Sequence, residues 1–167
     1  MWKAPGVRNN TAAELGDQGQ YDGRPHMTSA ASLTLHIPGT NEAIRPATEQ
    51  AEAWLAEQNV SFEAMYLASL TIEELVTNCI KYGFPDDPSV HTIHVTFSVR
   101  DRTLEVQVID DGNPFNPLEV PAPDLSLPAE DRPIGGLGLH LLRELADAVT
   151  YERRERTNVL RLTKRMT

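Results

Sequence analysis

Two stretches of alternating apolar residues, separated by two residues, constrain the fold of this chain most strongly. The first is HTIHVTFSVR at residues 91–100, and the second is TLEVQVID at residues 103–110. Because a strand turns successive side chains to opposite faces, each stretch has one apolar face. These faces consist of Ile93, Val95, Phe97 and Val99, and of Leu104, Val106 and Val108. The Asp101-Arg102 pair between the stretches predicts a β-hairpin.

Helical and strand patterns surround this hairpin, and apolar spacing distinguishes the two. In chain order they are a strand over residues 33–37, an amphipathic helix over about 44–59, a helix from a Ser61 cap to about Lys81, a helix that follows Gly138, and two strands within 148–165 around a turn near Thr157-Asn158. This order predicts an α+β fold. We expect a two-layer α/β sandwich, in which helices cover one face of a mixed, mostly antiparallel sheet.

The first 27 residues differ in composition from the rest. They contain three basic and three acidic side chains, few large aliphatic residues and many polar or small ones, so they cannot bury much surface. We expect residues 1–27 to form a disordered tail and residues 28–167 to form one globular domain. The chain contains neither a secretory signal pattern nor an apolar run approaching the roughly 20 residues of a membrane span. A soluble, cytoplasmic protein is expected.

The net charge of −9 lies entirely in residues 28–167, because the charges of the tail cancel. A surface this acidic argues against direct binding to nucleic acid phosphates. The only cysteine, Cys79, lies within an apolar helical pattern, which excludes disulfides and cysteine metal clusters. Its thiol is expected to be buried and inert.

The segment TIEELVTNCIKYGF, residues 71–84, places polar side chains on an otherwise apolar helix. Glu74 and Asn78 are four residues apart and share one stripe, with Lys81 close to the same line and Tyr82 one turn beyond Asn78. The apolar stripe consists of Met65, Ile72, Leu75, Val76 and Cys79. Taken alone, the polar stripe favours the solvated edge of an amphipathic helix over a functional site.

The second strand of the hairpin ends in a carboxylate. The alternation that turns Val108 inward also turns Asp110 inward and Asp111 outward. A buried carboxylate needs hydrogen-bond donors, and the exocyclic amine of a purine would be one. Gly112 would let a ring approach the backbone closely. An Asp-Gly turn that simply ends the strand explains this stretch equally well.

Three glycines open the last predicted helix. In PIGGLGLHLL, Gly135, Gly136 and Gly138 leave backbone amides uncovered at a helix start, where the dipole favours anions. This suits a phosphate, and a flexible junction between loop and helix is the alternative. Neither the dinucleotide fingerprint nor the Walker pattern is present. Residues 111–134 hold six of the twelve prolines, which predicts a long loop before this helix.

Together and in this order, the three segments resemble the GHKL superfamily of ATP-binding domains, which has the Bergerat fold. That superfamily has an N box with a glutamate and an asparagine, a G1 box of the form DxGxG and a glycine-rich G2 box. The corresponding segments here are EELVTN, DDGNPF and GGLGL, and the resemblance covers about residues 33–165. EELVTNCIKYGF and the closing YERRERTNVLRLTKR are most similar to the anti-sigma factor serine/threonine kinases of bacterial partner switching.

The resemblance implies a role for individual residues. Asn78 would bind a Mg2+ ion that bridges the phosphates, Asp110 would accept from the adenine amino group, and Glu74 would act as general base. Residues 113–134 would form a long ATP lid. The nucleotide-binding residues implied in full are Asn78, Lys81, Tyr82, Gly83, Asp110, Gly112, Phe115, Arg132, Gly135, Gly136, Leu137, Gly138 and Leu139, with Arg132 at the γ-phosphate.

The implied function is that of an ATP-binding anti-sigma factor with serine/threonine protein kinase activity, which phosphorylates a STAS-domain anti-sigma factor antagonist. ATP and Mg2+ would be its cofactors, and its partners would be a sigma factor, the antagonist and a second copy in a homodimer. Two departures from the family pattern concern phosphotransfer. Pro114 replaces the second glycine of DxGxG, and Pro133 and Ile134 stand where the usual lid arginine would be. A nucleotide-dependent binding module without phosphotransfer is therefore the alternative.

Overall fold

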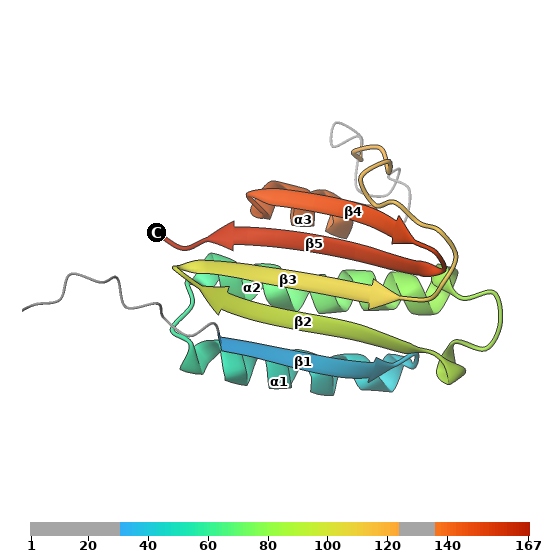
Figure 1. Cartoon of the computed structure of the whole chain (residues 1–167), viewed down its shortest axis with the longest axis horizontal. Coiled ribbons are helices and arrows are strands. Elements are labelled where there is room, and N and C mark those ends of the chain that lie inside the picture. Colours follow the sequence, from blue (N-terminus) through green and yellow to red (C-terminus); the bar gives the residue numbers. More distant parts are fainter. Residues whose placement is uncertain (1–30, 124–135) are drawn as a thin grey trace, which may run out of the picture.

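Five strands form one sheet in the computed structural model, which describes residues 31–123 and 136–167 (Figure 1). The strands are β1 (Ala31–Pro38), β2 (Thr92–Arg100), β3 (Thr103–Asp110), β4 (Ala148–Arg154) and β5 (Thr157–Arg165). Their order across the sheet is β1-β2-β3-β5-β4, and each neighbouring pair is antiparallel. The predicted α+β class with a mostly antiparallel sheet is confirmed.

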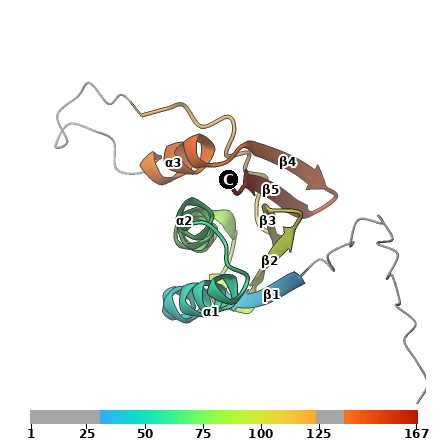
Figure 2. The ribbon, with the colours of Figure 1, turned by 90° about the vertical axis from the view of Figure 1, so that its left-hand side faces the viewer.

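Helices cover one face of this sheet. They are α1 (Ile44–Glu57), α2 (Phe62–Thr71) and α3 (Leu137–Leu145), and short 3-10 turns lie at Asn41–Ala43 and Pro88–Val90. Figure 2 shows the three helices on the same side of the sheet, which confirms the predicted two layers. The predicted cap of α2 is also present, because Ser61 Oγ accepts from the backbone N–H of Ala64 at 3.3 Å.

The hairpin of β2 and β3 supplies the middle of the core. Asp101 and Arg102 both have positive φ, 48° and 57°, as in the two-residue turns that match the twist of antiparallel strands. Phe97 is fully buried and lies opposite Val106, which lies opposite Leu162 of β5. The predicted hairpin and the inward direction of its apolar residues are confirmed.

The turn between β4 and β5 differs from the prediction. It consists of Glu155 and Arg156, with Glu155 at a φ of 52°, and both Thr157 and Asn158 already belong to β5. The two predicted strands and the turn between them are present, but the turn lies two residues before the predicted position. Asparagine is common in turns, yet Asn158 here makes hydrogen bonds from within a strand. In the sheet, Asn158 lies directly opposite Asp110 of β3.

The helical segment after α2 is not a regular α-helix up to Lys81. Beyond Thr71 the chain forms two wide π-helical turns, Ile72–Val76 and Cys79–Gly83, and becomes extended at Phe84. Such turns often occur at functional sites. A wide turn rotates side chains less per residue than an α-helix does, so the sequence spacing of Glu74 and Asn78 does not by itself place them on one face.

Two predicted segments lie outside the described residues, wholly or in part. The predicted tail, residues 1–27, is one, and residues 124–134 of the predicted lid are the other. Residues 113–123, the first part of that lid, contain neither helix nor strand, as their prolines predict. Among the helices that the structure describes, none combines the length and the apolar character that crossing a membrane requires.

Two glycines allow the end of the helical segment to approach the loop that follows β3. A Cβ atom on Gly112 would lie 2.7 Å from the carbonyl oxygen of Gly83 and 2.9 Å from Asp110 Oδ1. The backbone N–H of Asn113 donates to the same Gly83 carbonyl at 2.6 Å. The sequence predicts a ligand ring beside Gly112. On the side where a Cβ atom would stand, the backbone of Gly83 takes the space.

We expect Gly112→Ala to lower the free energy of unfolding by about 1–3 kcal/mol, because two backbone segments must separate to admit the methyl group. Gly83→Ala is the matched control, since a Cβ atom there would meet only ordinary contacts, the nearest at 3.6 Å from the Cys79 side chain. Urea denaturation of both variants measures the difference. Equal stability of the two variants would contradict the importance of this close approach.

Candidate functional site

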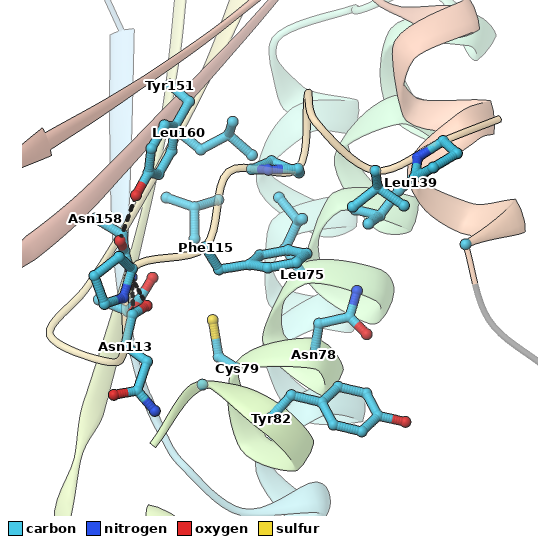
Figure 3. Close-up of a pocket in the computed structure, with 18 of the residues that line it drawn as sticks. Leu75, Asn78, Cys79, Tyr82, Asn113, Phe115, Leu139, Tyr151, Asn158 and Leu160 are labelled. Carbon is cyan, nitrogen blue, oxygen red and sulfur yellow. Dashed lines mark hydrogen bonds between the residues drawn. The ribbon is translucent and has the colours of Figure 1, made fainter. Parts of the chain in front are cut away.

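A cavity of about 600 Å³ lies between the helical segment after α2, the end of β3, the start of β5, the loop after β3 and the start of α3, and β4 contributes Tyr151 (Figure 3). Its walls are mostly apolar and include Leu75, Val108, Phe115, Leu139 and Leu160. Polar groups reach it from Asn78, Asp110, Tyr151 and Asn158. An apolar cavity of this size with a few polar groups suits one small-molecule ligand.

The structure brings many of the predicted nucleotide-binding residues together at this cavity. Those that line it are Asn78, Tyr82, Gly83, Asp110, Phe115, Gly136 and Leu139. The lining does not include Lys81, Gly112, Leu137 or Gly138, and Lys81 is exposed at the surface. Arg132 and Gly135 lie outside the described residues.

One stripe of the helical segment faces the cavity and consists of Leu75, Asn78, Cys79 and Tyr82 (Figure 3). The sequence predicts Leu75 and Cys79 on a core stripe instead, with Cys79 buried. Leu75 is buried but also borders the cavity, while Cys79 is half-buried with its sulfur towards the cavity. The stripe therefore offers mostly apolar side chains together with the amide of Asn78.

Asp110 is the buried carboxylate of the cavity, 7% exposed, and its predicted inward direction is confirmed. Its Oδ1 accepts from the backbone N–H of Gly112 at 2.9 Å and from Nδ2 of Asn158 at 2.8 Å. Asp111 is exposed, as predicted. The end of β3 thus presents an anchored carboxylate that can accept a hydrogen bond from a ligand.

Asn158 is a site residue that the sequence analysis missed. Its Oδ1 accepts from the Tyr151 hydroxyl and from Nη1 of Arg153, both at 2.8 Å (Figure 3 shows the bond from Tyr151). The alternation of β5 contained the signal, because Asn158 has the same parity as the inward Leu160 and Leu162. Because the predicted turn included Asn158, this residue was not assigned to the strand.

Glu74 lies beside the start of α3. A Cβ atom on Gly138 would overlap the Glu74 side chain, so the glycine leaves the space that this carboxylate occupies. Gly136, at the cap of α3, has a φ of 84°, which residues with a side chain rarely adopt. The backbone N–H groups and the dipole at this helix end favour negative charge. Glu74 is not among the residues that line the cavity, but it lies beside a helix start that favours anions, and Gly136 at this start does line the cavity.

Comparison with known proteins identifies the class of this domain. Residues 37–164 match the histidine kinase-like ATPase domain family. The chain belongs to this family. It is 30% identical over 136 residues to the serine/threonine-protein kinase BtrW of Bordetella bronchiseptica, a match that covers 81% of this chain and 94% of that one. It is 29% identical over 121 residues to the serine-protein kinase RsbW of Listeria monocytogenes, covering 70% of this chain and 76% of that one.

A solved structure supports the fold of this histidine kinase-like ATPase domain. The crystal structure of the RsbU and RsbW domains of a Mycobacterium tuberculosis protein matches with a TM-score of 0.59 at 21% identity. The match covers 81% of this chain and 32% of that chain, so this chain spans about a third of its length. The predicted membership of the GHKL superfamily, and of its serine/threonine kinase subgroup, is confirmed by the family match and the two kinases.

The residues present fit ATP, the nucleotide that this ATPase family implies. An anchored carboxylate at Asp110 suits the amino group of adenine, and the apolar stripe with Leu75 suits the ring. The helix start at Gly136 suits phosphates. The amide of Asn78 lines the same cavity, and its oxygen suits Mg2+, which keeps most of its waters.

Burial raises the pKa of the Cys79 thiol well above its usual range, and the negative charge of Asp110 and a hydrogen bond with that carboxylate act in the same direction. The reactive form of cysteine is the thiolate. Cys79 is therefore a weak nucleophile although it faces the cavity.

We expect Cys79 in the folded chain to react with a maleimide at pH 8 at least about tenfold more slowly than in the urea-unfolded chain, because less thiolate is present. Bound Mg·ATP should slow the reaction further by covering the sulfur. Mass spectrometry measures the rate without ambiguity, since the chain has one cysteine. Equal rates in the folded and unfolded chains would contradict this environment.

His91 links the loop after the helical segment, through Asp86, to the residue that follows β3, Asp111. Its Nε2 lies 2.7 Å from Asp86 Oδ1 and its Nδ1 lies 2.9 Å from Asp111 Oδ1. Its ring stacks on Phe84 with centroids 4.2 Å apart. The hydrogen bond to Asp86 raises the pKa of His91, and Asp111 adds to this, while burial opposes it.

The stability that His91 contributes should depend on pH. Because its folded-state pKa is raised above the ordinary value near 6.5, the contribution is fully present below that value and is lost as the pH rises through the folded pKa. We expect His91→Gln to destabilise the chain more at pH 6 than at pH 9 in urea denaturation. His140→Gln on α3 is the control. A loss that is the same at both pH values would contradict the charged bridge.

Proposed function

We propose that this protein is an ATP-binding anti-sigma factor with serine/threonine protein kinase activity, which phosphorylates a STAS-domain anti-sigma factor antagonist. The observation that carries the proposal is the position of Glu74 against Gly138, beside the helix end where phosphates would bind. A carboxylate there can take the proton of an incoming hydroxyl group. Identities of 30% and 29% to two protein kinases support the same activity.

ATP would lie in the cavity with its base at Asp110 and its phosphates at the start of α3. Asp110 would accept a hydrogen bond from the adenine amino group, and the backbone N–H groups at Gly136 and Gly138 would hold phosphate oxygens. The remaining residues proposed to contact the nucleotide are Lys81, Tyr82, Gly83, Gly112, Phe115, Leu137 and Leu139. Arg132 and Gly135, both outside the described residues, complete the proposed set.

Asn78 would bind Mg2+ through its amide oxygen, together with phosphate oxygens and water. Mg2+, when bound, neutralises the charge that develops during phosphoryl transfer. Glu74 would receive the proton of the attacking serine or threonine hydroxyl. The demands on this chain are therefore positioning and one base, as in other phosphoryl transfers.

The proposed partners are a sigma factor and the STAS-domain antagonist, and the proposed assembly is a homodimer. These partners follow from the anti-sigma subgroup that the sequence resembles. With a net charge of −9 the chain is unsuited to gripping DNA phosphates, so its influence on transcription would act through the sigma factor. This role would place the protein in the cytoplasm.

Glu74→Gln should separate phosphotransfer from ATP binding. We expect transfer to slow by about 100-fold or more, because the general base is lost, while the ATP affinity persists. The assay supplies labelled ATP, Mg2+ and the antagonist encoded near the gene, and follows label on the antagonist. Glu73→Gln, a change at the neighbouring exposed carboxylate, is the matched control and should transfer normally.

Asn78→Ala extends this assay, since loss of the Mg2+ ligand should weaken ATP binding as well as transfer. Calorimetry with and without Mg2+ measures the binding. ATP binding without transfer to any candidate antagonist would contradict the kinase activity and favour a nucleotide-dependent binding module. An unchanged ATP affinity in Asp110→Asn would contradict the assignment of the site.

A further inference from the structure

Asn158 uses every hydrogen-bonding position of its amide at the junction of β3, β4 and β5. Oδ1 accepts two bonds, from Tyr151 and Arg153, and Nδ2 donates two, to Asp110 Oδ1 at 2.8 Å and to the backbone carbonyl of Asn113 at 2.9 Å. Asn158 is only 6% exposed. Its position is therefore fixed by four hydrogen bonds at a place that is little exposed to solvent.

The neighbours of this amide determine its orientation. The Arg153 guanidinium can only donate, and the ionised carboxylate of Asp110 can only accept. The amide oxygen must therefore face Arg153, and the amide nitrogen must face Asp110. An amide in this orientation links a positive and a negative group and at the same time keeps them apart.

We propose that Asn158 is a positioning residue that holds Arg153 away from Asp110 and so keeps this carboxylate available to the adenine amino group. The proposal rests on the proposed function, because it takes adenine to be the ligand. The two bonds that anchor Asp110, from the Gly112 N–H and from Asn158, both use Oδ1. Oδ2 accepts neither of these two bonds, and it is the oxygen that we assign to the ligand.

Without the amide, Arg153 would have a direct route to the carboxylate. Its Nη1 already donates to the carbonyl oxygen of Gly112 at 2.8 Å, only two residues along the chain from Asp110. Arginine and carboxylate groups form strong pairs that are often bidentate and then occupy both oxygens. At a carboxylate that is 7% exposed, water would screen such a pair weakly. The pair would compete with adenine for Asp110.

The test compares Asn158→Ala with the double variant Asn158→Ala/Arg153→Gln. We expect Asn158→Ala to weaken ATP binding about tenfold or more, because the carboxylate loses an anchoring bond and gains a competitor. The double variant should recover a large part of this loss, since the competing guanidinium is gone. Arg154→Gln is the matched control, because it removes the adjacent exposed guanidinium, which pairs with Glu152, and it should leave ATP affinity unchanged.

Calorimetry of the full chain with Mg·ATP and Mg·GTP provides the affinities, and circular dichroism verifies that each variant is folded. The preference for ATP over GTP should fall in Asn158→Ala and return in the double variant, which a merely structural role would not produce. If Asn158→Ala does not fold, Asn158→Ser carries the same comparison.

Two outcomes would overturn the role of Asn158 alone. One is ATP binding by Asn158→Ala as tight as that of the unaltered chain, and the other is a double variant that binds no better than Asn158→Ala. Failure of the unaltered chain to bind ATP would instead overturn the proposed function and the role of Asn158 together.

Discussion

The anchored carboxylate of Asp110 is the interaction on which the rest of the site depends. A charge that is 7% exposed is tolerated only when hydrogen-bond donors surround it. Here the donors come from the loop after β3, through the N–H of Gly112, and from β5, through Asn158. Asn158 in turn is held by Tyr151 and Arg153 of β4. The hydrogen bonds that compensate the charge of Asp110 therefore join β3, β4, β5 and the loop after β3 around the cavity.

Two glycines shape this site because they have no Cβ atom. At Gly112 the absence of a Cβ atom lets the carbonyl of Gly83 come close, which brings the helical segment against the loop after β3. At Gly138 the same absence leaves room for Glu74 beside α3. Both contacts join segments that are far apart in the sequence. The glycines of the G1 and G2 boxes therefore set distances between protein segments, and not only the approach of a ligand.

The sequence predicts those parts of the fold that follow from local spacing. The hairpin of β2 and β3, the Ser61 cap and the inward Asp110 depend on period, turn length and capping chemistry, and all are confirmed. The wide turns after Thr71 could not be predicted, because the apolar spacing indicates a helix but does not distinguish π-helical from α-helical turns. The sequence alone could have predicted the role of Asn158. The inward carboxylate of Asp110 requires a hydrogen-bond donor, and the alternation of side chains along β5 turns the Asn158 amide to the same face. The roles of Glu74, Asn78 and the other proposed site residues stay predictions, and Arg132 and Gly135 also lie outside the described residues.

The short turn at Glu155 and Arg156 has a consequence for how this chain can vary in length. Exposed turns usually tolerate insertions and deletions, because few contacts depend on them. Only Thr157 separates this turn from Asn158, the residue that faces Asp110, and a one-residue slip of β5 would turn Asn158 to the opposite face of the sheet. Any added residue must therefore be absorbed within the turn itself. The length of a solvent-exposed turn is thus tied to the position of a residue that lines the cavity.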